Sequence, residues 1–428
     1  MLFGQAYQVR RRGPILALHS SDGALRAPGA NGEGQSRGPA PKVARPAHTT
    51  VRGARWQQAR SEGDAAITTS LHIAFTPLHV IRATQIAASD QSRRSALAWV
   101  PNFPNPSGFS AMSAWSNTVF DAQFLLEPPY RRTKASVATR HWDLLRHLSR
   151  AVRQVRPESV FVYADGTAAV QAAVRRAQRQ RPSCELIYVE DGLDVYTQKN
   201  STTDARAFRS TKRALERLVY GPNWTREGRL GTRFKYHRRL ATYPGLVVDE
   251  LAGPDSQWSE LPYLDGTVQQ ALHELSQLWC RSVAEPDNAA LVLLPLTVAG
   301  NKSVSPYMKE PLSCLRESGL SLLIKAHPGD SATQFPDLMP GTVMPVDIPA
   351  EAIALAWEDA IQVVVGDCTT ALYTIPTIAP SIVSVSVGRL LGPALERCVR
   401  TLARLGVNAP SSMQELLNAL EDITGTPA

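Results

Sequence analysis

The sequence predicts an α/β protein with two parallel β-sheets. Short apolar runs rich in Val, Ile and Leu alternate with stretches of helical periodicity along most of the 428 residues. The chain is also too long for one ordinary core, which indicates two domains. Three of the apolar runs lead into polar residues: Glu190-Asp191-Gly192, His327-Pro328 and Thr369-Thr370.

The first 68 residues are expected to be a disordered basic extension. They are rich in Gly, Pro, Ala, Arg and Ser and show no sustained periodicity. They contain ten Lys or Arg and four acidic residues, and so account for +6 of the net charge of +8. The rest of the chain is nearly neutral, which argues against charge-driven binding of nucleic acid.

The cysteines and the hydropathy indicate the compartment. The five cysteines are scattered without CxxC spacing, and no Cys/His cluster has the spacing of zinc ligands. No apolar run reaches the roughly 18–20 residues that span a bilayer. We therefore expect a cytoplasmic protein, either in solution or at the inner face of the cell membrane. The oligomeric state stays open, with a homodimer as one alternative.

The first predicted domain spans residues 69–252. Pro77 suits the first position of a helix, where its missing N–H costs nothing. Leu145, Leu148 and Val152 recur at helical spacing on a later helix. We predict strands at 71–75, 96–100, 123–126, 159–163, 186–189 and 246–248, and helices at 79–88, 140–155, 167–179 and 205–220.

The basic and aromatic segment 221–243 is interpreted as either an exposed connector or a contact with an acidic acceptor or a phospholipid surface. Two Pro-containing turns, Gly253-Pro254-Asp255 and Leu261-Pro262-Tyr263, mark a linker at 253–266.

The second predicted domain, 267–428, alternates in the same way. We predict strands at 290–294, 320–324, 361–365 and 381–385, and helices at 267–282, 305–317, 350–358, from 369, 389–405 and 411–423. Strands that alternate with helices imply parallel sheets with right-handed crossovers. The expected architecture is therefore two Rossmann-like domains facing a central cleft. The G-x-G-x-x-G fingerprint is absent, which disfavours a dinucleotide dehydrogenase.

The acidic pair Glu190 and Asp191 is the first candidate for chemistry. In open α/β sheets, ligands bind at the carboxyl ends of strands, and a carboxylate in a closed cleft suits removal of a proton from a hydroxyl group. The structural alternative is that one acid caps the following turn and the other pairs with an arginine. Asp165-Gly166 is a decoy of the same form at another strand end, and the sequence does not dismiss it.

The second domain supplies the other candidates. His327 follows a strand and precedes Pro328, so a rigid loop holds its ring, which can donate a proton to a leaving phosphate. Lys325 shares a face with His327 if the strand continues, and adds positive charge near an anionic donor. Thr369 and Thr370 open a helix, where hydroxyls and free N–H groups bind anions or simply cap the helix.

The order of an acidic-acidic-Gly motif, a His-Pro motif and a hydroxyl pair resembles the bacterial sialyltransferases that act on lipooligosaccharide or make polysialic acid capsules. Those families carry the first motif in the first domain and the other two in the second. The segment Phe75-Thr76-Pro77-Leu78 is similar to their first strand and turn. The resemblance covers residues 70–390 as short motifs in the same order. In the third motif, threonines beside Cys368 replace the expected serine-led pair.

The resemblance implies a metal-independent inverting glycosyltransferase of the GT-B type, which needs no cofactor and uses CMP-sialic acid as donor and a cell-surface glycan as acceptor. It implies that Asp191 is the base, that Glu190 supports it and that His327 stabilises the leaving phosphate. The implied substrate contacts are Gly192, Lys325, Pro328, Thr369, Thr370 and Thr76. Two alternatives stay open: the same fold with another nucleotide-linked donor, such as a CMP-keto-sugar, a nucleotide hexose or a CDP-polyol, and a non-catalytic homologue that binds a glycan or a nucleotide.

Overall fold

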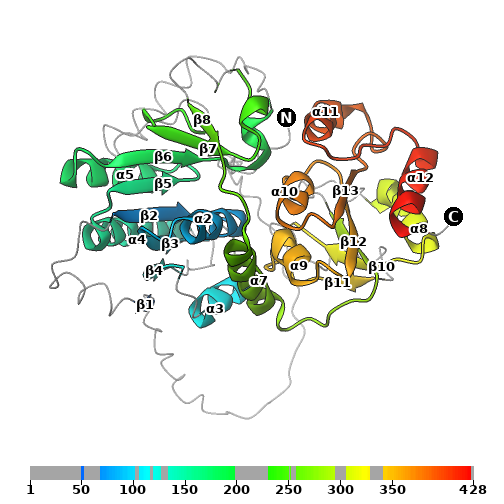
Figure 1. The fold of residues 1–428 in the computed structure, drawn as a ribbon, viewed down its shortest axis with the longest axis horizontal. Coiled ribbons are helices and arrows are strands. Elements are labelled where there is room, and N and C mark those ends of the chain that lie inside the picture. The colour runs from blue at the N-terminus through cyan, green and yellow to red at the C-terminus, as the bar shows by residue number, and fades with distance from the viewer. Residues whose placement is uncertain are drawn as a thin grey trace, which may run out of the picture. The chain divides into compact units, whose positions relative to one another are not determined.

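A computed structural model gives the fold (Figure 1). All the described residues lie in the compact unit Ala47–Ala428. The described residues are 50–52, 68–101, 106–115, 119–126, 134–197, 230–249, 251, 257–294, 305–327 and 341–425. The predicted helix at 205–220 lies outside them, and so does Pro328.

The first sheet has eight strands in the order β1-β4-β3-β2-β5-β6-β7-β8. All neighbouring strands are parallel except β1 and β4, which are antiparallel. The strands are β1 (Thr50–Arg52), β2 (Thr69–Ala74), β3 (Arg94–Trp99), β4 (Ala122–Leu125), β5 (Ser159–Val162), β6 (Glu185–Val189), β7 (Arg238–Ala241) and β8 (Trp258–Glu260). The accompanying helices are α2 (Pro77–Ser89), α3 (Pro106–Ala114), α4 (Lys134–Val155), α5 (Ala168–Gln180), and the 3₁₀ turns η1 (Gly192–Val195) and η2 (Pro244–Leu246).

The second sheet has five parallel strands in the order β11-β10-β9-β12-β13. The strands are β9 (Ala289–Leu293), β10 (Ser321–Lys325), β11 (Thr342–Val343), β12 (Ile361–Gly366) and β13 (Val383–Ser386). The helices are α7 (Gly266–Cys280), α8 (Ser305–Glu317), α9 (Ala350–Ala356), α10 (Ala371–Ile378), η5 (Pro393–Leu395), α11 (Glu396–Arg404) and α12 (Met413–Thr424). The predicted α/β class with two Rossmann-like sheets is therefore confirmed, while the central cleft stays a prediction.

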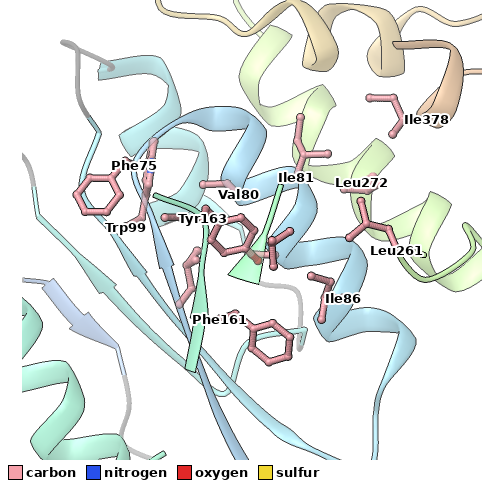
Figure 2. Packing of buried hydrophobic residues seen from close by; sticks show 14 of the residues in the cluster. Phe75, Val80, Ile81, Ile86, Trp99, Phe161, Tyr163, Leu261, Leu272 and Ile378 are labelled. Atoms are coloured by element: carbon pink, nitrogen blue, oxygen red, sulfur yellow. The ribbon is translucent and has the colours of Figure 1, made fainter. Parts of the chain in front are cut away.

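The strands of both sheets form the core, since parallel sheets are covered on both faces. All five residues of β9 are buried, as are the last four of β6. The larger cluster of buried side chains includes Ile81 of α2, Leu272 of α7 and Ile378 of α10 (Figure 2). Helix α2 is thus fixed by apolar packing as well as by its own hydrogen bonds. None of the described helices is long and apolar enough to span a bilayer.

Four details differ from the sequence predictions. The strand predicted at 246–248 is wrong: the Pro244-Gly245 break places the 3₁₀ turn η2 there. Strand β7 lies instead within the segment interpreted as a connector, and β8 lies within the predicted linker. Both are short, polar strands at the end of the sheet, and an apolar-run criterion misses them. Helix α3 lies in a segment for which no helix or strand was predicted. Strand β1, which pairs with β4, lies within the predicted basic extension.

A buried histidine in β2 makes the fold sensitive to acid. The ring of His72 stacks on Phe161 with centroids 4.3 Å apart, and its Nδ1 is 3.0 Å from the hydroxyl of Tyr163. Its Nε2 is buried and has no hydrogen-bond partner among the described residues. Burial lowers the pKa of His72 to about 3, so the ring is neutral in the folded protein at neutral pH.

We expect His72→Phe to reduce the loss of stability in acid. Between pH 6.5 and 3 the unfolded chain binds a proton at this residue and the folded chain does not, so stability falls as the pH falls. At 1.36 kcal/mol per pKa unit, the contribution is on the order of 4 kcal/mol. Urea unfolding at pH 7 and pH 4 measures it. If the free energy of unfolding falls by the same amount from pH 7 to pH 4 in the wild type and in His72→Phe, this interpretation is contradicted.

Candidate functional site

The candidate site is built on the turn that follows β6. Strand β6 lies between β5 and β7, so its carboxyl end opens within the sheet and not at its edge. Gly192 has φ of +71°, a conformation that side chains disfavour. A Cβ there would lie 2.5 Å from the hydroxyl oxygen of Thr370, so no larger residue fits without displacing it. This glycine thus allows both the turn and the close approach of Thr370.

Asp191 is held by a histidine that the sequence analysis did not single out. His79 Nε2 lies 2.7 Å from Asp191 Oδ1. The backbone N–H of Phe75 donates to His79 Nδ1 at 3.2 Å. Because a backbone N–H can only donate, Nδ1 must be the acceptor, and the ring proton is on Nε2 and points at the carboxylate. The Asp191 side chain is 25% exposed and that of His79 only 1%.

The turn before α2 brings His79 to this position. The Thr76 hydroxyl caps the helix by accepting a hydrogen bond from the backbone N–H of His79 at 3.2 Å, and Pro77 occupies the first turn as expected. Thr76, a predicted substrate contact, is thus engaged in orienting the first turn of α2.

Glu190 is at the centre of a buried polar network. Its side chain is 1% exposed and forms an ion pair with Arg82 at 3.1 Å. The backbone N–H of Thr242 donates to it at 2.9 Å, and the hydroxyl of Tyr373 at 3.5 Å. The hydroxyls of Thr242 and Tyr196 also donate to it. With its two oxygens saturated and away from solvent, Glu190 can anchor the turn, but it does not contact a substrate in this arrangement.

Asp165, the other candidate acid at a strand end, is also a buried carboxylate whose hydrogen bonds stabilise the fold. It is fully buried and accepts hydrogen bonds from the backbone N–H groups of Gly231 and Arg233, at 3.1 and 3.2 Å. The Arg233 guanidinium lies 2.6 Å from it and the Tyr236 hydroxyl 3.0 Å. Four donors therefore tie the segment before β7 to the end of β5. Of the three strand-end acids, Asp191 is the one with a partly exposed carboxylate.

The second sheet contributes the hydroxyl pair. Thr369 and Thr370 follow β12 and precede α10, and both side chains are partly exposed. The Leu193 N–H donates to Thr370 Oγ1 at 3.4 Å, which joins the acidic turn to the start of α10. The hydroxyl hydrogen of Thr370 is not used in that bond and can be donated to an anion. Thr370 makes no side-chain cap of α10, so the capping alternative does not apply to it.

His327 and Lys325 lie at the end of β10. Strands β10 and β12 both flank β9, and their last residues, Lys325 and Gly366, both pair with Leu293, so these two strand ends are two strand spacings apart, on the order of 10 Å. Lys325 is 5% exposed, and its ammonium donates to the carbonyls of Ala326 and Val346 at 2.6 and 3.0 Å. Burial lowers its pKa to about 8 despite Glu351 and Asp347 nearby. Two of the three N–H donors of the Lys325 ammonium are therefore engaged with the backbone.

Several residues that contact the acidic turn were not among the candidates from the sequence, and His79, Arg82 and Tyr373 are three of them. His79 and Arg82 are three residues apart on α2, and so share a face; one holds Asp191 and the other Glu190. Tyr373 stands three residues after Thr370 and reaches the same turn. The available signal was a histidine and an arginine in the helix that follows the first strand, whose remaining residues are apolar or uncharged.

Two further features bear on the site. A hollow lined by Gln362, Ser381, Val383 and Asn408 lies at the amino ends of β12 and β13, the opposite end of the sheet from Thr369. Within the described ranges, no three His, Cys, Asp or Glu side chains are grouped as metal ligands.

Comparisons with known proteins give likenesses of fold. No family model and no curated protein matches the sequence. Similar solved structures include the glycotransferase of kitacinnamycin, with 12% identity, a TM-score of 0.46, and coverage of 85% of this chain and 92% of that one. An alpha/beta-galactoside alpha-2,3-sialyltransferase from Photobacterium phosphoreum has 11% identity and a TM-score of 0.46, over 81% of this chain and 99% of that one.

A third similar structure is the UDP-GlcNAc 2-epimerase from Neisseria meningitidis bound to UDP-GlcNAc, with 10% identity and a TM-score of 0.45 over 84% of this chain and 92% of that one. All three TM-scores are below 0.5, so these likenesses concern the fold alone.

Proposed function

We propose that the protein is an inverting, metal-independent glycosyltransferase of the GT-B type that transfers sialic acid from CMP-sialic acid to a hydroxyl group of a cell-surface glycan. The observation that supports it best is Asp191, a partly exposed carboxylate at a strand's carboxyl end with one oxygen held by His79 and the anion-binding candidate Thr370 beside it. CMP-sialic acid is proposed as the donor because the acidic-acidic-Gly, His-Pro and hydroxyl-pair motifs follow one another in the sequence in the order found in the bacterial sialyltransferases.

In the proposed reaction, Asp191 Oδ2 removes the proton of the acceptor hydroxyl as that oxygen attacks the anomeric carbon of the donor. No described residue donates a hydrogen bond to Oδ2. The bond between the anomeric carbon and the CMP phosphate oxygen breaks in the same step, so the anomeric configuration inverts. The hydroxyls of Thr369 and Thr370 and the N–H groups that begin α10 stabilise the phosphate, and His327 donates a hydrogen bond or a proton to it.

The acceptor and the setting follow from this proposal. A glycan assembled at the inner face of the membrane would bring the protein there. Contact with the membrane surface and assembly into a homodimer are parts of the proposal that separate experiments address, namely vesicle sedimentation and analytical ultracentrifugation.

Calorimetric titration with CMP, UMP and CDP tests the donor class. We expect the wild type to bind CMP more tightly than UMP, because a CMP-sugar enzyme must distinguish the base. We expect His327→Ala to weaken CMP binding about tenfold, since the loss of one hydrogen bond to a charged group is worth about 1.5 kcal/mol or more. Equal binding of CMP and UMP, independent of His327, contradicts the proposal. Preferential binding of CDP or UMP points to the alternative donors.

A further inference from the structure

We propose that His79 is a positioning residue that gives the two oxygens of Asp191 separate tasks. This inference rests on the proposed role of Asp191 as the base. The Nε2–H of His79 fixes Oδ1 at 2.7 Å, and Oδ2 is left for the proton of the acceptor hydroxyl. His79 itself stays away from the substrate, because its side chain is 1% exposed.

The surroundings of His79 allow it one tautomer and one orientation. The Phe75 N–H at 3.2 Å occupies Nδ1, so a flipped ring would bring that N–H against a carbon and would leave Asp191 without a donor. The ring also stacks on Tyr163 with centroids 5.1 Å apart. Phe75 and Tyr163 both belong to the buried cluster around α2 (Figure 2). The imidazole is therefore held by the backbone on one side and by an aromatic ring on its face.

This pair differs from the His–Asp pairs of hydrolases in which of its two residues is buried. In those enzymes the buried aspartate orients a histidine that faces the substrate. Here the histidine is buried and the aspartate is partly exposed, so the carboxylate is the group that reacts. A neutral N–H donor orients a carboxylate without placing a full positive charge beside it, which would make the carboxylate a weaker base. The nearby cation, Arg82, is engaged with Glu190 instead.

Two variants of His79 measure the contribution of the donor. His79→Leu removes the hydrogen bond and lets the carboxylate rotate. We expect kcat with CMP-sialic acid to fall about 10²-fold, the typical cost of a misplaced reacting group. The affinity for CMP should change less than twofold, because the donor phosphate is proposed to bind the second sheet. His79→Gln keeps an N–H donor in reach of Oδ1 and should recover at least tenfold of the lost activity. Equal activity of the wild type and His79→Leu overturns the inference.

A measurement that needs no turnover distinguishes a failure of this inference from a failure of the proposed function. In protein labelled with ¹⁵N at its nine histidines, His79 should show a protonated Nε2 and an unprotonated Nδ1, with the His79→Gln spectrum giving the assignment. The Nε2-bound proton should exchange slowly in the wild type and rapidly in Asp191→Ala. A proton on Nδ1, or an unchanged exchange rate in Asp191→Ala, overturns the inference. A wild type with this His79 signal and no turnover of CMP-sialic acid contradicts the proposed function instead.

Discussion

Asp191→Asn is expected to lower kcat for the proposed sialic acid transfer by about 10²–10⁴-fold, the range that a positioned general base contributes. The amide has the size of the carboxylate, and its oxygen can still accept the hydrogen bond from His79 Nε2. It cannot accept the proton of the acceptor hydroxyl. The affinity for CMP and the free energy of unfolding should therefore stay close to those of the wild type. The measurement is the initial rate of CMP release in the presence of an acceptor.

The matched control for this variant is Asp194→Asn. Asp194 is three residues further along the same turn and is also partly exposed, so the substitution removes the same charge from the same element. We expect this control to retain activity within about threefold, because asparagine keeps the size and the oxygen of the side chain and the charge that it removes is not the one proposed to accept the proton. Comparable losses in both variants would mean that the net charge of the turn, and not a base at Asp191, is what matters.

The second large effect is expected from Arg82→Met. The guanidinium and the Glu190 carboxylate are each 1% exposed and 3.1 Å apart. Methionine occupies a similar volume but leaves the carboxylate buried without its cation. Breaking a buried pair in this way typically costs about 3–5 kcal/mol of unfolding free energy. Urea unfolding followed by circular dichroism measures it. The activity should fall as well, because the turn that carries Asp191 is anchored through Glu190.

The chain provides a matched control for the ion pair. Arg181 and Glu158 are 2.6 Å apart, but their side chains are 43% and 27% exposed. Arg181→Met should therefore cost no more than about 1 kcal/mol. The double variant Arg82→Met/Glu190→Gln should be more stable than the sum of the two single changes predicts, because it removes both charges together. A cost for Arg82→Met as small as that for Arg181→Met would contradict the role of this network.

The sequence predicts most of the second sheet because its strands are buried on both faces. The predicted helix at 305–317 matches α8, and the strand predicted at 361–365 matches all but the last residue of β12. Continuous apolar runs, such as Val363–Val365, give a strong signal in parallel sheets. Strand β7 has the sequence Arg-Arg-Leu-Ala and gave no such signal. Its partners, and not its own composition, make it a strand.

The site was predictable in part. The sequence places Asp191 and Glu190 at a strand end, but it does not separate their roles. The structural alternative, in which one acid pairs with an arginine, applies to Glu190, whose partner Arg82 is 108 residues earlier in the chain. Pairing between residues so far apart in the chain depends on how α2 packs, and the local sequence pattern does not predict that packing. The same is true of His79, which is separated from Asp191 by 112 residues.

The anomeric configuration of the product tests the central claim most directly. Wild-type protein is incubated with CMP-sialic acid and a panel of glycan acceptors, and the product is analysed by NMR. A single displacement with Asp191 as the base predicts one CMP released for each sialic acid transferred, with the configuration at the anomeric carbon inverted. A product with retained configuration, or a sugar covalently attached to Asp191, would contradict the account, because it would make this carboxylate a nucleophile.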